Sequence, residues 1–254
     1  MMFRGWFACL VAALTATILI SQPALVGAAE GGAHWGYSGD DGPGNWASLS
    51  SKYAACATGK RQSPVNLADP QKAPLADIET QLGGTNLSVV NNGHTVQVDI
   101  EQGSTLRIDG KSYRLVQFHF HTPSEHTLDG KAMPMEAHFV HAADDGHLAV
   151  IGVFIMLGAP NQVIATIWSA MPRHEGKVPL TAAIDLNSLL PKVRIFFRYK
   201  GSLTTPPCSE TVTWTVLSRP ITISPEQLKA FATLYPMNAR PVQSLYQRGI
   251  LTNN

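Results

Sequence analysis

The stretch Gln117-Phe118-His119-Phe120-His121 alternates polar and apolar side chains, which is the pattern of a half-buried β-strand. Successive side chains in a strand point to opposite faces, so Gln117, His119 and His121 share one face. Two imidazoles two residues apart on a rigid strand lie side by side. This spacing suits two nitrogen atoms that converge on one metal ion.

A second alternating segment, residues 135–141, supplies a third imidazole, because it places Glu136 and His138 on one strand face. Between the two segments the chain contains Asp129-Gly130, a turn signal. We therefore expect the two strands to fold back as antiparallel neighbours. That arrangement would bring three imidazoles around one point.

Each candidate ligand has a polar neighbour two residues away on the same face: Gln117 beside His119, and Glu136 beside His138. A ligating histidine usually donates its second ring N–H to such a group, which fixes the tautomer and the ring direction. The pattern predicts a Zn²⁺ site in which solvent takes the fourth position. The alternative is a set of surface histidines on the solvated side of a hairpin.

The first residues have the three-part pattern of a secretory signal peptide. Arg4 precedes an apolar run over residues 6–20, and small residues follow at 27–29. We expect residues 1–29 to be cleaved, which leaves one domain over residues 30–254 in an exported protein, periplasmic or secreted, without a membrane anchor. The rival interpretation is a membrane-spanning anchor, but the apolar run is about fifteen residues, short of the ~20 that a spanning helix needs.

Composition limits the partners of the mature chain. Loss of Arg4 with the leader reduces 19 basic residues to 18, against 18 acidic ones, so the net charge is near zero. A neutral chain argues against nucleic acid or a charged membrane surface as the main partner.

Many short alternating runs, such as residues 96–100 and 211–216, together with 21 Gly and 17 Pro, favour a mainly β (α+β) fold with long loops. The best helical patterns cover residues 161–170, 182–190 and 225–234, and Ser224 is the expected N-cap of the last one. After export two cysteines remain, Cys56 and Cys208, and an oxidising compartment would let them form a disulfide bond. Two free buried thiols are the alternative.

Three further residues are candidates for chemistry. His94 follows the turn Asn91-Asn92-Gly93, and its imidazole can exchange protons near neutral pH, although a histidine at a turn is often merely solvated. Pro206 and Pro207 would hold the nearby Thr204 hydroxyl rigidly. If the Thr204 hydroxyl donates its one hydrogen to the carboxylate of Glu125, it can only accept a hydrogen bond from its other neighbour. A zinc-bound hydroxide at that place would donate this bond, so the hydroxyl would select and orient the deprotonated nucleophile. Otherwise Glu125 is a solvated loop charge.

At this point the sequence resembles the α-class carbonic anhydrases, in particular the compact bacterial branch. The resemblance covers roughly residues 33 to 251 and follows the order of the family's motifs. The matching segments are His34-Trp35-Gly36-Tyr37, Gln62-Ser63-Pro64-Val65-Asn66, Asn91-Asn92-Gly93-His94, Gln117-Phe118-His119-Phe120-His121, Ser124-Glu125-His126-Thr127, Glu136-Ala137-His138, Gly201-Ser202-Leu203-Thr204-Thr205-Pro206-Pro207 and Asn238-Ala239-Arg240-Pro241.

The resemblance implies a central, twisted, mostly antiparallel sheet of about ten strands with few short helices, and a zinc enzyme that hydrates carbon dioxide to bicarbonate. His119, His121 and His138 would be the ligands, with Gln117, Glu136 and the backbone carbonyl of Asn238 as their hydrogen-bond acceptors. Thr204 and Glu125 would orient the hydroxide, and His94 would be the proton shuttle. Tyr37, Asn92 and Gln97 would line the water chain; Val140, Val150, Leu203, Val212 and Trp214 would form the carbon dioxide pocket, and Thr205 would contact bicarbonate.

Two departures from the family pattern have consequences. The connections after His121 and after His141 are short, which indicates a more open mouth of the site, and Gln97 replaces the family's second asparagine of the polar wall. Bacterial members often pair, so a homodimer is a hypothesis. Among the other histidines we expect His126 and His141 to be buried supports and His34, His147 and His174 to lie at the surface.

Two other function classes stay open. A family member that has lost its ligands could be a non-catalytic binding module, although the intact histidine triad argues against this. A zinc hydrolase acting on esters or peptides is the second alternative, but the sequence contains neither H-E-x-x-H nor G-x-S-x-G.

Overall fold

The computed structural model describes residues 33–254. The predicted leader over residues 1–29 and the domain boundary at residue 30 lie outside the described residues, so both stay predictions. Within the described part, no helix is both long and apolar enough to cross a membrane.

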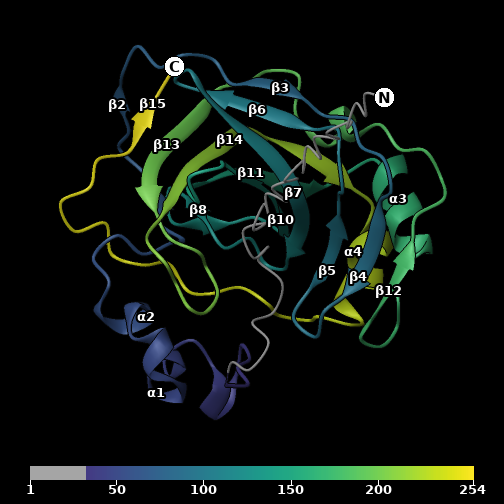
Figure 1. The fold of residues 1–254 in the computed structure, drawn as a ribbon, viewed down its shortest axis with the longest axis horizontal. Helices are drawn as coiled ribbons and strands as arrows, with labels where there is room; N and C mark the ends of the chain where they lie inside the picture. Colours follow the sequence, from purple (N-terminus) through teal and green to yellow (C-terminus); the bar gives the residue numbers. More distant parts are fainter. Residues whose placement is uncertain (1–32) are drawn as a thin grey trace, which may run out of the picture.

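A twelve-stranded twisted sheet dominates the fold (Figure 1). Ten strands follow one path in the order β12-β4-β5-β7-β10-β11-β14-β13-β15-β2, while β6 pairs with β7 and β3. All pairs in this sheet are antiparallel except β11 with β14 and β15 with β2. The prediction of a mainly β fold around a large, mostly antiparallel sheet is confirmed.

The strand bounds follow the chain. The sheet contains β2 (Gln71–Lys72), β3 (Glu79–Gln81), β4 (Ser88–Asn91), β5 (Val96–Asp99), β6 (Thr105–Ile108), β7 (Lys111–His121), β10 (Met135–Ala142), β11 (Leu148–Leu157), β12 (Gly176–Pro179), β13 (Phe196–Gly201), β14 (Val212–Ile223) and β15 (Leu251–Thr252). A second sheet of three short strands contains β1 (Asn66–Leu67), β8 (Thr127–Leu128) and β9 (Lys131–Ala132), so β8 and β9 occupy the connection between β7 and β10.

The long strands β7 and β10 are antiparallel neighbours, as the turn signal between them predicted. His138 lies opposite His119 in the register, and Glu136 lies opposite His121. Because side chains alternate between the faces of a sheet, all three candidate ligands emerge on one face.

Each face of the sheet carries its own apolar cluster. Phe118, Phe120 and Phe139 belong to the larger cluster, to which the helical segments 162–169 and 225–232 also contribute apolar side chains. Val140, Val150 and other residues of the opposite parity form a second cluster on the face that carries the candidate ligands. The alternation over residues 117–121 therefore separates a packed hydrophobic layer from the face that carries the candidate ligands.

The helices are short. Two expected helices are present as α3 (Gln162–Ser169), capped by the Asn161 side chain, and α4 (Pro225–Ala232), opened by a capping box of Ser224 and Gln227. The helix expected over residues 182–190 was wrong in extent: only a 3-10 turn, η3 (Leu186–Leu189), forms there, because the Asp185 side chain caps one turn and Leu190 is already extended. The remaining elements precede the sheet: η1 (Gly39–Asp41), α1 (Trp46–Leu49), η2 (Ser51–Tyr53) and α2 (Ala55–Thr58).

The predicted disulfide bond is present. Cys56 in α2 and Cys208 in the loop before β14 are joined across a sequence separation of 152 residues, and their Cα atoms are 5.1 Å apart. The bridge ties the helical N-terminal part to the loop that carries Thr204.

Candidate metal centre

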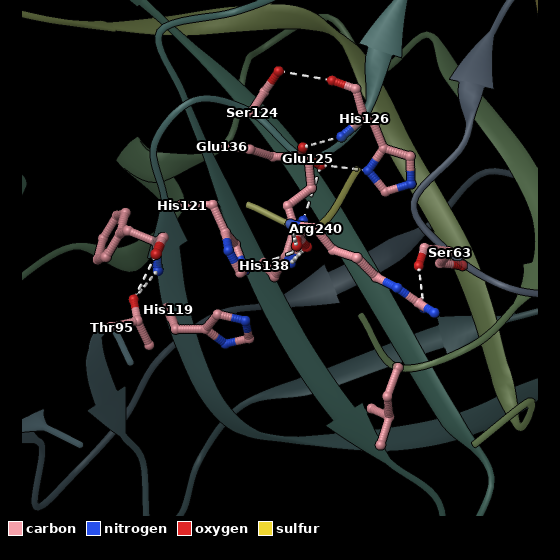
Figure 2. Close-up of polar contacts among 12 residues, drawn as sticks. Ser63, Thr95, His119, His121, Ser124, Glu125, His126, Glu136, His138 and Arg240 are labelled. Atoms are coloured by element: carbon pink, nitrogen blue, oxygen red, sulfur yellow. Dashed lines mark hydrogen bonds and ion pairs between the residues drawn. The ribbon is translucent and has the colours of Figure 1, made fainter. Parts of the chain in front are cut away.

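Three imidazoles meet on the functional face of β7 and β10 (Figure 2). One nitrogen from each of His119, His121 and His138 lies within 4.8 Å of the others. The ring centroids are 5.0 Å apart for His119 and His121, 5.4 Å for His119 and His138, and 4.6 Å for His121 and His138. The sequence-predicted ligand set is therefore assembled.

The other nitrogen of each ring is engaged by a polar partner. Nδ1 of His119 donates to Oε1 of Gln117 at 2.8 Å, and Nδ1 of His121 donates to the carbonyl oxygen of Asn238 at 2.7 Å. Nε2 of His138 lies 3.0 Å from Oε1 of Glu136, in an ion-pair contact whose geometry falls short of a hydrogen bond. The nitrogens left to face one another are Nε2 of His119, Nε2 of His121 and Nδ1 of His138.

This arrangement fits a metal ion. Nε2 of His121 is buried and has no hydrogen-bond partner among residues 33–254, which is costly unless a cation binds there. Burial lowers the pKa of both His119 and His121, and the neighbouring imidazoles lower that of His119 further. Both rings are therefore neutral near pH 7, as metal ligation requires. Three imidazole donors leave one position of a tetrahedral ion for solvent.

Glu136 connects this centre to a buried hydrogen-bond network. Its carboxylate lies 2.7 Å from Nδ1 of His126 and accepts from the His126 backbone N–H at 2.8 Å. Burial acts to raise the pKa of Glu136, but His126 and His138 hold it well below its usual range. On its other side, Nε2 of His126 lies 2.6 Å from the hydroxyl of Tyr199, which contacts Ser63 at 2.9 Å. His126 is thus the buried support that the sequence predicted.

The other histidines also lie where expected. His141 is fully buried, its Nδ1 donates to the Phe139 carbonyl, and burial lowers its pKa to about 4. The surface histidines are His34, His147 and His174.

Glu125 lies beside the ring nitrogens that converge at the candidate metal centre. Its Oε2 is 3.6 Å from Nε2 of His121 and 3.8 Å from Nδ1 of His138, while its Oε1 accepts from the Arg240 backbone N–H at 2.8 Å. Oε2 has no hydrogen-bond partner within the described part of the chain. Thr204 is buried and lies four residues before Cys208 of the disulfide. Within the described residues, no hydrogen bond joins the Thr204 hydroxyl to Glu125.

Reciprocal hydrogen bonds hold the start of the Thr204 loop. The Ser63 N–H donates to the Ser202 hydroxyl at 2.9 Å, and the Ser202 N–H donates to the Ser63 hydroxyl at 3.1 Å. The Trp214 indole N–H donates to the Ser202 carbonyl at 3.0 Å. The loop is thus fixed at this end independently of the disulfide.

His94 lies at the turn after β4 and is half-buried. Its ring stacks on Trp35 with centroids 3.7 Å apart and an interplanar angle of 6°. Burial lowers the pKa of His94, as does His34, whereas Glu175 raises it. The Asn238 side-chain amide donates to the His94 carbonyl at 3.0 Å, so Asn238 links this turn to the candidate ligand His121.

Two of the polar residues expected to line a water chain have local partners. Oδ1 of Asn92 accepts from the backbone N–H groups of His94 and Thr95, so it shapes the turn. The Gln97 amide donates to Oδ1 of Asp99 at 2.6 Å. Burial, assisted by the charge of Glu125, raises the pKa of Tyr37 well above its usual range, so this phenol stays protonated.

The residues expected to form an apolar pocket are brought together. Val140, Val150, Val212 and Trp214 are at most 3% exposed and share one cluster, against which the half-buried Leu203 packs. Thr205 follows in the same loop and is half-buried.

Arg240 is a site residue to which sequence reasoning assigned no function, although it belongs to a quoted motif. It is 2% exposed, and its guanidinium donates to Oε1 of Gln62 and to the carbonyls of Ser63 and Cys56. Burial lowers its pKa to about 10. The side chain thus fixes the backbone N–H that binds Glu125.

The fold and the site together define a class of protein: a large twisted sheet whose central strands bring three histidines together as a candidate metal centre beside an apolar cluster. The family model for eukaryotic-type carbonic anhydrases matches residues 41–254. The chain belongs to this family.

Relatives and solved structures agree with this assignment. A carbonic anhydrase of Neisseria gonorrhoeae is 42% identical over 94% of this chain and 96% of its own length, and one of Nostoc sp. is 43% identical over 86% and 85%. The α-carbonic anhydrase of Thermovibrio ammonificans, solved with the inhibitor sulfanilamide, superimposes with a TM-score of 0.85 at 48% identity over 87% of this chain and all of that one. Dioscorin, solved with ascorbate, shares the fold at 27% identity with a TM-score of 0.81 over 86% of this chain and 97% of that one.

Proposed function

We propose that the protein reversibly hydrates carbon dioxide to bicarbonate and a proton, with Zn²⁺ held by His119, His121 and His138. The observation that supports this most strongly is the convergence of three ring nitrogens whose opposite nitrogens face Gln117, Asn238 and Glu136. A bound Zn²⁺ lowers the pKa of a coordinated water to about 7 and so supplies hydroxide as nucleophile, an effect for which carbonic anhydrases are the reference case.

Thr204 and Glu125 orient the nucleophile. The Arg240 backbone N–H holds one oxygen of the Glu125 carboxylate, and the free oxygen faces the ligand rings. In the working site a Thr204 hydroxyl that donates to this free oxygen can only accept from the nucleophile, which selects its deprotonated form. Removal of that hydroxyl therefore costs rate without loss of a metal ligand.

The apolar cluster beside the centre receives carbon dioxide. Val140, Val150, Val212, Trp214 and Leu203 provide a wall without charge, which suits a small apolar substrate. Thr205, which is half-buried and follows Thr204 in its loop, contacts the polar product bicarbonate.

His94 carries the product proton towards solvent. Its ring is half-buried at the turn and stacks on Trp35, and its backbone is tied to Asn238 beside the ligand His121. Tyr37, Asn92 and Gln97 line the polar side of the path. An imidazole can both accept and release this proton, because one of its ring nitrogens is free to bind it.

Stopped-flow hydration of carbon dioxide by the zinc-loaded protein tests the function. We expect rapid hydration, and we expect Thr204→Ala to retain zinc but to be slower by about 100-fold, the range in which loss of one positioned hydrogen bond acts. A zinc-loaded protein without hydration activity would favour a binding module, and one that hydrolyses esters faster than it hydrates carbon dioxide would favour a zinc hydrolase.

We also propose that the chain is exported to the periplasm or secreted. The Cys56–Cys208 disulfide supports this, because such bonds persist in oxidising compartments. Fractionation of cells expressing the full chain tests the location, and light scattering of the purified protein tests the proposed homodimer.

A further inference from the structure

An acidic side chain lies at the turn that carries His94, on a neighbouring element. Glu175 immediately precedes β12, and β12 pairs with β4 so that Gly176 lies opposite Asn91. The pairing brings Glu175 to the Asn92-Gly93 turn. The Glu175 side chain is exposed, and it takes no part in the proposed hydration reaction.

The contact between Glu175 and this turn is close. Oε1 of Glu175 lies 2.8 Å from the position that a Cβ atom on Gly93 would occupy, and Gly93 has a φ of +83°. A residue with a side chain at position 93 would therefore be strained and would also collide with the carboxylate. The glycine lets the carboxylate approach the backbone next to His94.

Two other charged side chains of the neighbouring elements have partners of their own. His34, from the N-terminal segment, also acts on His94, and it pairs with Asp41 at 3.8 Å. Lys177, the basic residue in β12, is engaged with Asp99 at 2.8 Å. The Trp35 ring that stacks on His94 is neutral.

We propose that the Glu175 carboxylate stabilises the protonated form of the His94 imidazole and is a positioning residue for proton exit from the site. The inference rests on the proposed shuttle function of His94. A negative charge at the turn that carries His94 offsets burial and the charge of His34, both of which disfavour protonation of the ring. The pKa of Tyr235, raised to about 12 chiefly by burial, also carries a contribution from Glu175, so the carboxylate acts on two side chains of this cluster.

The effect of Glu175→Gln on His94 can be measured without reference to turnover. An NMR titration of the His94 ring in the zinc-loaded protein should show protonation at a lower pH in the variant than in the native protein. Glu175→Asp should restore most of the native behaviour, and Glu79→Gln, which removes an exposed carboxylate on β3 at a different part of the sheet, should change nothing. The difference should shrink at high salt, because exposed charges are screened.

Turnover gives the second measurement. In weak buffer the Glu175→Gln variant should hydrate carbon dioxide about twofold more slowly than the native protein, as expected for one solvent-screened charge. Strong buffer should abolish the difference. The substitution should have no effect in a His94→Ala background. Identical His94 titrations in Glu175→Gln and native protein would overturn the proposal. Absence of hydration in the native protein would overturn the proposed function, but the NMR titration would still test the effect of Glu175 on His94.

Discussion

Removal of the disulfide by Cys56→Ala/Cys208→Ala should cost a large share of the folding free energy. The bridge closes a loop with a sequence separation of 152 residues. The chain-entropy relation gives about 5 kcal/mol for a loop of this length at 25 °C. Domains of this kind are typically stable by only about 5 to 15 kcal/mol, so the variant should be near the limit of stability.

Activity should fall much less than stability. Cys208 lies four residues beyond Thr204, but the start of this loop is also held by Ser63, Ser202 and Trp214. The folded fraction of the variant should therefore keep its zinc and lose on the order of tenfold or less in hydration rate, as expected when a positioned group gains freedom.

Urea unfolding followed by fluorescence measures the free energy, and stopped-flow hydration measures the rate. Native protein unfolded in the presence of a reductant is the matched control, because it keeps both sulfur atoms and loses only the bond. A loss of less than about 1 kcal/mol in the variant would refute the reasoning, because the unfolded state would then gain little freedom from the open loop.

Three other predictions follow from the site. His94→Ala should keep its zinc and turn over more slowly in weak buffer, with recovery when imidazole buffer is added; unchanged turnover would exclude the shuttle function. Glu136→Gln should weaken zinc binding by about 10- to 100-fold in chelator competition, because the carboxylate orients His138, and native affinity would contradict this. Folding lowers the His141 pKa from 6.5 to about 4. The free energy of unfolding should therefore decrease by about 3 kcal/mol in total as the pH falls from 6.5 towards 4. His141→Gln should remove this part of the pH dependence, and an unfolding free energy in urea that depends on pH as in the native protein would count against the prediction.

The centre of the fold could be predicted because its signal is local. Alternation fixes which side chains of β7 and β10 share a face, and the turn signal between the strands fixes their pairing, so the positions of His119, His121 and His138 follow. The capped helices α3 and α4 were predicted for the same reason, since Asn161 and Ser224 lie next to the helices that they cap.

The parts that could not be predicted depend on contacts between distant segments. The link from Arg240 to Glu125 joins residues 115 positions apart, and the contact of Tyr199 with His126 spans 73. Neither of these two contacts is indicated by a periodic pattern in the sequence. The short helices α1 and α2 also lack a pattern of their own, and their position depends on the buried Trp46 and on the disulfide.

The central claim is that three imidazoles from two neighbouring strands hold one zinc ion, and metal analysis tests it most directly. Protein refolded with zinc and freed of excess metal should contain one zinc per chain, His119→Ala should lose most of it, and the matched surface variant His34→Ala should keep it. Full zinc occupancy in folded His119→Ala would contradict the account.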